Sequence, residues 1–282
     1  MRAIIDIGSN SVRLMMPDGK KTVITTALGE GLAHTGMLQG EPINRTILAI
    51  MQLAEIARAE GCEVEAFATE AVRSAKNGAE FTAMLSALGV PVRVLTGREE
   101  ALSGYLGATG GRGGVLIDVG GASTEIISGK GEEIMFSVSL PIGIIRARDM
   151  FGEDYEALTA HVNELMENAK VQVFAEEVIG IGGTAISVAA VDSGEAYDVK
   201  NTHGRRITRE GLIAIRSRLI AMTRAERLTV PGLAISRVDT VCGGLTIILA
   251  VIERLGATCM VASESDNMEG YLAMTEAERA TR

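Results

Sequence analysis

Apolar and polar residues alternate along the chain in short blocks that predict strands, turns and helices in succession. Apolar runs at 3–7, 12–16 and 22–26 are separated by polar turns, a pattern that predicts antiparallel strands joined as hairpins. Apolar residues at near-helical spacing predict helices at 44–60 and 77–88, and a glycine follows each of them. Three further elements complete the first half: strands at 64–68 and 90–95 and a helix at 98–106.

The second half begins with the same arrangement of strands. An apolar run at 115–119 enters a polar turn, 125–127 leaves that turn, and a third strand at 133–140 follows a hairpin turn at 129–131. The elements predicted after these strands are helices at 156–174, 208–221, 239–255 and 268–282, a strand at 258–262, and a glycine-rich turn at 180–183 that opens another helix. Strands and helices in this succession predict an α/β fold.

Two segments of the chain share one short motif. Residues 6–11 are Asp-Ile-Gly-Ser-Asn-Ser and residues 118–123 are Asp-Val-Gly-Gly-Ala-Ser, an offset of 112 residues. Similar predicted strands flank both motifs, which indicates an internal duplication at the scale of a domain. Five of the eight residues at 107–114 are glycine, so this stretch is predicted to be the linker.

We therefore predict two domains, 1–112 and 113–282, and we expect that the last helix, about 268–282, is able to pack back on the first domain.

Composition narrows the classes of function. The 282 residues are 47% hydrophobic but only 3% aromatic, with no Trp, so the chain lacks the stacking platforms of single-strand nucleic-acid binders. The formal net charge of −9 means that any attraction for a polyanion is local, through backbone N–H groups or a metal ion. Three widely separated cysteines indicate reduced thiols and neither a disulfide framework nor a zinc site. The chain starts without a signal-peptide pattern and has no long apolar stretch, so we expect a cytoplasmic protein with no membrane span.

The two Asp-x-Gly turns carry the first candidate chemistry. A phosphate group needs several N–H donors that converge on it, and glycines let the backbone approach closely. The Asp that ends each strand, Asp6 or Asp118, is a hard oxygen ligand suited to magnesium, directly or through water. One such motif alone would be interpreted as an ordinary hairpin turn, but two equivalent motifs favour phosphate binding. The residues assigned to phosphate binding are Gly8, Ser9, Asn10, Ser11, Arg73, Gly120, Gly121, Ala122, Ser123 and Thr124.

Carboxylates near these turns are candidates for activating a water molecule. Glu99 and Glu100 precede the predicted linker, and Glu125 follows the second turn. The local pattern by itself favours a solvated helix N-terminus for Glu99 and Glu100. The turn at 180–183 is equally consistent with holding a nucleotide and with packing a helix against a strand. Arg73 taken alone, and the basic cluster at 205–209, are interpreted as solvated surface charges, and the three histidines are not assigned as ligands.

Several segments in order resemble the exopolyphosphatase/guanosine pentaphosphate phosphohydrolase (Ppx/GppA) family, within the actin, Hsp70 and sugar-kinase superfamily (ASKHA). Their order and spacing match the family over nearly the whole chain. The segments that carry the resemblance are 5–14, 28–32, 68–77, 97–101, 117–125, 139–143 and 182–185.

The resemblance implies two ribonuclease-H-like domains with mixed sheets and an active site in the cleft between them. It assigns the role of catalytic base to Glu100, against the local interpretation, and a catalytic or metal-positioning role to Glu125. Two segments depart from the family pattern. Ala122 stands where the family usually has a third glycine, and 263–270 match the C-terminal motif only loosely. The chain resembles the short, two-domain members of the family, for which processive action on long chains is not implied.

We therefore predict a phosphatase that uses Mg²⁺ (or Mn²⁺) to hydrolyse terminal phosphoanhydride bonds of polyphosphate, of pppGpp, or of both. One alternative is a regulatory module that binds alarmone or polyphosphate with little turnover. Another is a kinase of the same superfamily, although no acceptor pocket is indicated. We expect no nucleic-acid polymer and no membrane as partner, and a homodimer is compatible with the sequence.

Overall fold

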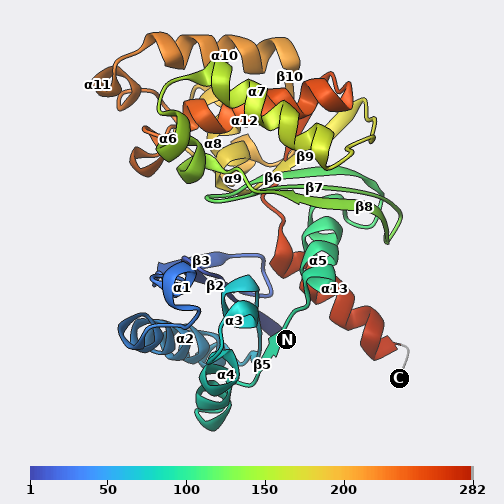
Figure 1. The fold of residues 1–282 in the computed structure, drawn as a ribbon. Helices are drawn as coiled ribbons and strands as arrows, with labels where there is room; N and C mark the ends of the chain where they lie inside the picture. Colours follow the sequence, from blue (N-terminus) through green and yellow to red (C-terminus); the bar gives the residue numbers. More distant parts are fainter. Residues whose placement is uncertain (281–282) are drawn as a thin grey trace. The chain divides into compact units, whose positions relative to one another are not determined.

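The computed structural model describes residues 1–280, which group into two compact units, 1–104 with 267–280 and 105–266 (Figure 1). Each unit is built on one mixed sheet covered by helices, which is the α/β architecture predicted from the alternation of strands and helices. Among the described residues, no helix combines the length and the hydropathy that crossing a membrane would require.

The first unit contains a five-stranded sheet in the order β3-β2-β1-β4-β5. The predicted antiparallel hairpins are confirmed, because β1 pairs with β2 and β2 with β3 in that sense, whereas β1–β4 and β4–β5 are parallel. The strands are β1 (Arg2–Ile7), β2 (Ser11–Met15), β3 (Lys21–Thr25), β4 (Glu63–Ala68) and β5 (Val92–Val94).

Helices cover both faces of this sheet. Ile5 and Ala66 face the core under α2, while Phe67 points to the opposite face, where the ring of Tyr271 stacks on it with centroids 4.6 Å apart. The helices of this unit are α1 (Leu32–Thr35), α2 (Gly40–Ala59), α3 (Glu70–Ser74), α4 (Gly78–Ala87), the start of α5 (Gly97–Thr109) and α13 (Asn267–Ala280). Residues 281 and 282 of the predicted last helix lie outside the described residues.

The second unit contains a six-stranded sheet in the order β8-β7-β6-β9-β11-β10. Its first five strands correspond in order to β3-β2-β1-β4-β5 of the first unit, and β10 is an additional edge strand. The pairing senses also repeat, since β6–β7 and β7–β8 are antiparallel and β6–β9 and β9–β11 are parallel. The same topology in both halves agrees with the duplication inferred from the shared motif. The strands are β6 (Gly114–Val119), β7 (Thr124–Lys130), β8 (Glu133–Leu140), β9 (Glu177–Ile181), β10 (Arg206–Thr208) and β11 (Cys259–Ala262).

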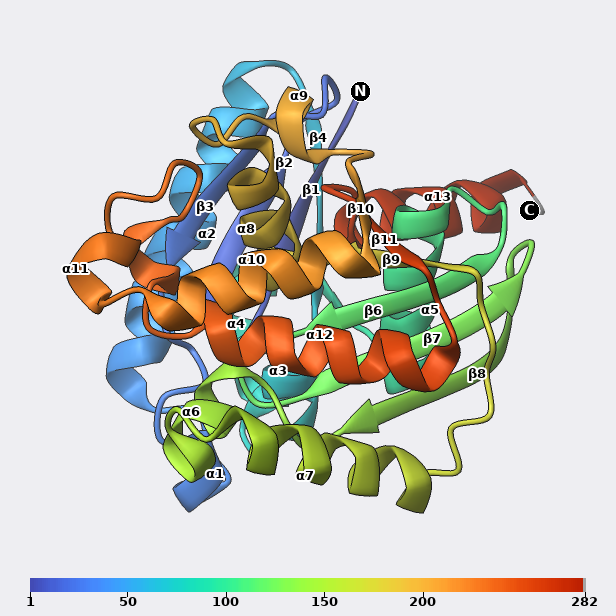
Figure 2. The ribbon, with the colours of Figure 1, turned by 90° about the horizontal axis from the view of Figure 1, so that it is seen from above.

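A layer of helices packs on one face of this second sheet around α12, which lies between α7 and α10 (Figure 2). Helix α12 is apolar over most of its surface and contributes much of the core, including Leu245, Ile248 and Ile252. The helices of the unit are α6 (Ile144–Phe151), α7 (Tyr155–Asn168), α8 (Gly182–Ser193), α9 (Val199–Thr202), α10 (Arg209–Ala221), α11 (Arg224–Arg227) and α12 (Val241–Leu255), with a 3₁₀ turn η1 at Ile235–Arg237.

The predicted linker at 107–114 is wrong in its first part. Helix α5 continues to Thr109 because Tyr105, Ala108 and Thr109 are buried and the Thr109 hydroxyl donates to the carbonyl of Tyr105 at 2.7 Å. Burial here outweighs the low helix propensity of Gly107. The two compact units divide between residues 104 and 105, inside α5, and not at the predicted boundary of 112/113.

The predicted helix at 156–174 is too long. Helix α7 ends at Asn168, where Lys170 takes a positive φ of 53° and the N–H groups of Lys170 and Val171 donate to Glu167 and Met166. This is a Schellman arrangement, which usually has glycine at the position of Lys170. No glycine or proline at 169–171 signals the end of the helix, so the apolar periodicity predicted a helix that is too long.

Candidate functional site

The first Asp-x-Gly turn joins β1 to β2. The N–H of Gly8 donates to the carbonyl of Ser11 at 3.0 Å and closes the turn. The carbonyls of Ser9 and Asn10 accept from the backbone of a following loop, at 2.7 Å from Gly29 and at 3.0 and 2.9 Å from Thr26 and Ala27. Because these bonds hold the turn by its carbonyls, Ser9 and Asn10 are free to expose their side chains, and both do so.

The second turn joins β6 to β7 with the same closing bond. The N–H of Gly120 donates to the carbonyl of Ser123 at 3.0 Å. The carbonyls of Gly120 and Gly121 accept from Ile144 and Ile145 at 2.9 and 2.8 Å, so the start of α6 holds this turn. There is no room for a Cβ at Gly143, which lies against the backbone of 120–122. The segment 139–143 therefore buttresses the turn.

Both turns leave backbone donors available. Within residues 1–280, no hydrogen bond uses the N–H of Ser9, Asn10, Gly121 or Ala122. Unused N–H groups on an exposed turn are the donors from which phosphate sites are built. Ala122 is exposed and its φ is not positive, so its methyl group neither strains nor blocks the turn in this structure.

The structure corrects the assignment of one hydroxyl to phosphate binding. Thr124 is fully buried, and its Oγ1 donates to the carbonyl of Ile142 at 2.6 Å. Its side chain therefore ties β7 to the buttressing segment and does not face a ligand. The hydroxyls of Ser11 and Ser123 are partly exposed and Ser9 is exposed, so these three remain available.

Each turn has a carboxylate behind it and a guanidinium beside that carboxylate. Asp6 is buried and forms an ion pair with Arg13, which lies directly opposite it on β2 and whose Nε donates to Oδ2 at 3.0 Å. In the second unit Asp118 is half-buried, and the charged partner is Arg237 of η1. The residue opposite Asp118 on β7 is Glu125, whose Oε1 accepts from the Ser139 hydroxyl at 2.7 Å.

The third glycine-rich turn packs closely around Asp118. Gly182 has a φ of 76°, and a Cβ there would collide with the Asp118 carboxylate. Gly183 has no room for a side chain because the guanidinium of Arg237 lies over it. Burial lowers the pKa of Arg237, and the charge of Asp118 opposes that effect. Glycine at 182 and 183 therefore lets the Asp118 carboxylate and the Arg237 guanidinium lie close to the backbone. The same turn begins helix α8.

Glu100 lies near the start of α5 and is oriented by an arginine from α3. Nη1 of Arg73 donates to Glu100 Oε2 at 2.8 Å and to the carbonyl of Leu95 at 2.6 Å, while Nη2 pairs with Glu70. Burial raises the pKa of Glu100, Arg73 acts against that rise, and the charges of Asp6 and Glu70 add to it. The structure thus places Arg73 against a carboxylate and not, as the local sequence suggested, in bulk solvent.

The neighbouring Glu99 has a different environment. Its Oε2 accepts from the N–H and hydroxyl of Thr96, both at 2.8 Å, and Oε1 accepts from Arg93 at 2.6 Å. These bonds, led by the one from the Thr96 backbone, lower the pKa of Glu99 to about 2. The Thr96 hydroxyl also accepts from the N–H of Glu99, which completes a capping box at the start of α5. Both glutamates lie in the first turn of α5, as predicted, but only Glu99 caps the helix, whereas Glu100 pairs with Arg73.

The donor set is suited to magnesium more than to zinc. Within residues 1–280, no three His, Cys, Asp or Glu side chains are grouped to hold a metal ion. Mg²⁺ is usually held by one or two carboxylates with waters and substrate phosphates, so a single Asp beside exposed hydroxyls at each turn fits it. His34, His161 and His203 are not assigned to either turn.

Two basic residues beside the turns are missed by sequence reasoning. Arg13 follows Asp6 by seven residues in a hairpin, so strand pairing could have placed it opposite Asp6. Arg237 lies more than a hundred residues from Asp118 and no local signal identifies it. The arginines at 205, 206 and 209 pair with Asp192, Glu177 and Glu210, in agreement with the interpretation as surface charges.

Comparison with known proteins gives consistent results over nearly the whole chain. The model of the Ppx/GppA phosphatase family matches residues 4–278. Exopolyphosphatase 2 of Mycobacterium tuberculosis strain H37Rv is 32% identical in an alignment 308 residues long, and the alignment covers 95% of this chain and 96% of that protein. The Ppx/GppA family member of Aquifex aeolicus superposes with a TM-score of 0.85 at 29% identity, covering 98% and 97% of the two chains. An exopolyphosphatase structure from Cytophaga hutchinsonii, 23% identical with a TM-score of 0.79 and 97% and 96% coverage, shares the fold.

Proposed function

The chain belongs to the Ppx/GppA phosphatase family, and from this premise we propose that it hydrolyses the terminal phosphoanhydride bond of inorganic polyphosphate, of pppGpp, or of both, and releases orthophosphate. The observation that carries the proposal is the pair of turns with unused backbone N–H groups at Ser9, Asn10, Gly121 and Ala122. The name of the relative from M. tuberculosis points to the same substrate class.

Binding of the substrate is assigned to the two turns. Backbone N–H groups of 8–11 and 120–123, with the hydroxyls of Ser9, Ser11 and Ser123, donate to phosphate oxygens. These donors carry no net charge, which explains how a chain with a net charge of −9 holds a polyanion. Arg73 also contacts phosphate in this proposal, with a phosphate oxygen taking the place of the exposed Glu70 carboxylate.

Water activation is assigned to Glu100. Its Oε2 is held by Arg73, so Oε1 is the atom that accepts a proton from the attacking water. The water oxygen forms a bond to the terminal phosphorus, the P–O bond to the remaining chain breaks, and its electron pair leaves with that chain. The raised pKa of Glu100 makes its carboxylate a stronger base than an exposed glutamate. Glu125, held by Ser139, has the secondary catalytic or metal-positioning role.

The proposed cofactor is Mg²⁺ or Mn²⁺, held by Asp6 and Asp118 directly or through water. When bound, such an ion neutralises charge on the phosphate oxygens. The proposed compartment is the cytoplasm.

The test is orthophosphate release by the purified protein from polyphosphates of defined length and from pppGpp, with magnesium and with EDTA. We expect magnesium-dependent release from at least one of the two substrate classes. Affinity for both is measured on the same preparation by calorimetry. Tight binding without phosphate release would contradict the hydrolase and favour the regulatory module. Substrate-dependent formation of ADP from ATP would indicate a kinase.

A further inference from the structure

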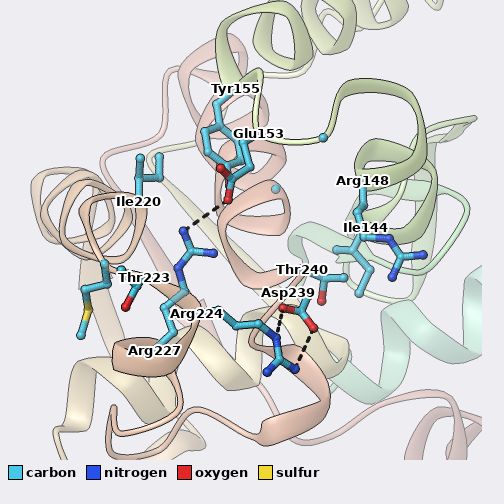
Figure 3. A pocket seen from close by; sticks show the side chains of 13 residues that line it. Ile144, Arg148, Glu153, Tyr155, Ile220, Thr223, Arg224, Arg227, Asp239 and Thr240 are labelled. Carbon is cyan, nitrogen blue, oxygen red and sulfur yellow. Dashed lines mark hydrogen bonds and ion pairs between the residues drawn. The ribbon is translucent and has the colours of Figure 1, made fainter.

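A cavity of about 500 Å³ lies within the second unit (Figure 3). It is enclosed by α6, the start of α7, the end of α10, α11 and the start of α12. Gly243 lines it and faces Ala147 and Leu158, whereas the next residue, Gly244, packs against Thr184 on the side of the second turn. No residue of the 118–123 turn lines the cavity, but Ile144 does, and its N–H donates to the carbonyl of Gly120 at 2.9 Å.

The cavity contains a buried guanidinium. Arg227 is only 7% exposed, and its Nε donates to the carbonyl of Leu219 at 2.7 Å. In Figure 3 its terminal nitrogens point toward Glu153 and Tyr155. The Glu153 carboxylate is 3.7 Å away, beyond hydrogen-bond distance, and the Glu153 side chain is 79% exposed. Within residues 1–280, the terminal nitrogens of Arg227 donate no hydrogen bond.

The other arginines of the cavity are satisfied. Arg224 makes two bonds to Asp239, at 2.8 and 3.2 Å, and Arg148 makes two to Asp149, at 3.1 and 2.9 Å. Arg227 differs from them because, within residues 1–280, its charged partner is the exposed Glu153 at 3.7 Å and its terminal nitrogens donate no hydrogen bond. Such a guanidinium is able to take one anionic acceptor with two oxygens, which matches a carboxylate in the bidentate geometry that arginine favours.

Part of the lining is apolar. Ile144, Ile220 and Met222 contribute aliphatic surface beside the ring of Tyr155. The guanidinium of Arg216 lies 5.9 Å from the centroid of that ring. The lining as a whole is more polar than apolar, and the volume is in the range typical of sites for small organic ligands.

We propose that this cavity binds a small organic monocarboxylate, with the carboxylate on the terminal nitrogens of Arg227 and the apolar part against Ile144, Ile220 and Met222. Glu153 acts as a weak internal competitor that swings outward when the ligand enters. A second negative charge on the ligand would find no unpaired cation among the lining residues, which disfavours phosphate esters. The site is independent of the proposed hydrolysis and would exist in a protein without turnover.

The experiment is calorimetric titration of the full chain with phenylacetate, its neutral isostere phenylacetamide, and inorganic phosphate. We expect phenylacetate to bind with one molecule per chain, and phenylacetamide to bind at least about tenfold more weakly because it lacks the charge. Phosphate is tested in the presence of saturating phenylacetate, and we expect it not to displace the carboxylate. Equal affinity for phenylacetate and phenylacetamide, absence of phenylacetate binding, or displacement by phosphate would overturn the proposal.

Variants place the binding in this cavity. Arg227→Gln is expected to weaken phenylacetate binding about tenfold or more, and Glu153→Gln to tighten it because the competing charge is gone. Arg148→Gln is the matched control, since that guanidinium is held by Asp149 and is expected to leave affinity unchanged. If Arg227→Gln loses its circular dichroism signal, the Glu153→Gln variant alone tests whether the ligand binds in this cavity. Glu153 is exposed, so we expect that variant to fold. An unchanged or weaker affinity in Glu153→Gln, or an equal loss in Arg148→Gln, would assign the binding elsewhere.

Discussion

The turn at 6–11 and the turn at 118–123 have the same backbone but different surroundings. Each is closed by one glycine N–H to serine carbonyl bond of 3.0 Å, and each follows a central strand that ends in Asp. Opposite the Asp, however, the first turn has Arg13 and the second has Glu125. The duplicated sheets therefore preserve the position of the backbone donors, while the charges beside them have diverged.

The supports of the two turns differ as well. A loop at 26–29 holds the carbonyls of the first turn, and the start of α6 holds those of the second. Glu100, with its Arg73 partner, belongs to the first unit and has no counterpart in the second turn's surroundings among the described residues. The repeated backbone is the basis of the anion binding proposed above, and the side chains that are not repeated are the basis of the proposed water activation.

The largest expected effect comes from the base that only one unit contains. Glu100→Gln should retain the fold and lose orthophosphate release by about 10³-fold, because the amide cannot accept the proton from water. Release is measured with polyphosphate and pppGpp under saturating magnesium. Glu99→Gln is the matched control, since Glu99 caps the helix, and its turnover should stay near that of the unchanged protein. Full turnover by Glu100→Gln would exclude its role as base.

The two aspartates test whether the turns are equivalent. Asp118→Asn and Asp6→Asn should each raise the magnesium concentration for half-maximal activity by about 10- to 100-fold, because each removes an anionic oxygen ligand. Asp6→Asn should also lower the melting temperature more than Asp118→Asn, since Asp6 is the more buried of the two and its loss takes away the partner of Arg13. A magnesium titration and a thermal melt distinguish the two effects. An unchanged magnesium requirement in both variants would show that neither aspartate holds the metal ion.

Arg73 is expected to set the pH dependence through Glu100. The guanidinium lowers the pKa of Glu100 against the rise caused by burial. Removing it in Arg73→Gln should raise that pKa further, so less of the carboxylate is ionised at a given pH. The acid limb of kcat/KM should therefore move to higher pH. Arg93→Gln, which removes a partner of Glu99 and not of Glu100, serves as the control, and an acid limb that shifts equally in both variants would contradict the assignment.

The smallest expected effect concerns stability at the start of α5. Glu99→Gln should lower the free energy of unfolding at neutral pH by about 1 kcal/mol through loss of the ionised cap. The pKa of Glu99 is lowered to about 2 from its ordinary 4.5, so its ionised form stabilises the fold above pH 4.5 and this contribution is lost as the pH falls toward 2. The difference between variant and unchanged protein should shrink over that range, as followed by urea unfolding at several pH values. A difference that stays constant down to pH 2 would show that ionisation of Glu99 is not its cause.

The amino-acid sequence alone determined most of the strands, though not β9 and β10, most of the helices and the repeated turns of this protein. The reason is that these elements depend on local periodicity, on glycines that permit tight turns, and on a motif repeated 112 residues apart. Glu100 became the candidate base only through resemblance to a family, because its local pattern is the same as that of the capping residue Glu99.

Tertiary structure alone decided what depends on contacts distant in the chain. Because Tyr105 and Thr109 are buried, α5 continues into a glycine-rich stretch. The hydroxyl of Thr124 donates to the carbonyl of Ile142 and is therefore not available to a phosphate. The packing of Arg237 over Gly183 and the burial of Arg227 beside the carbonyl of Leu219 arise from contacts that only folding creates. Desolvation and ion pairing are properties of those packed surroundings, and a pattern of residue types along one chain does not encode them locally.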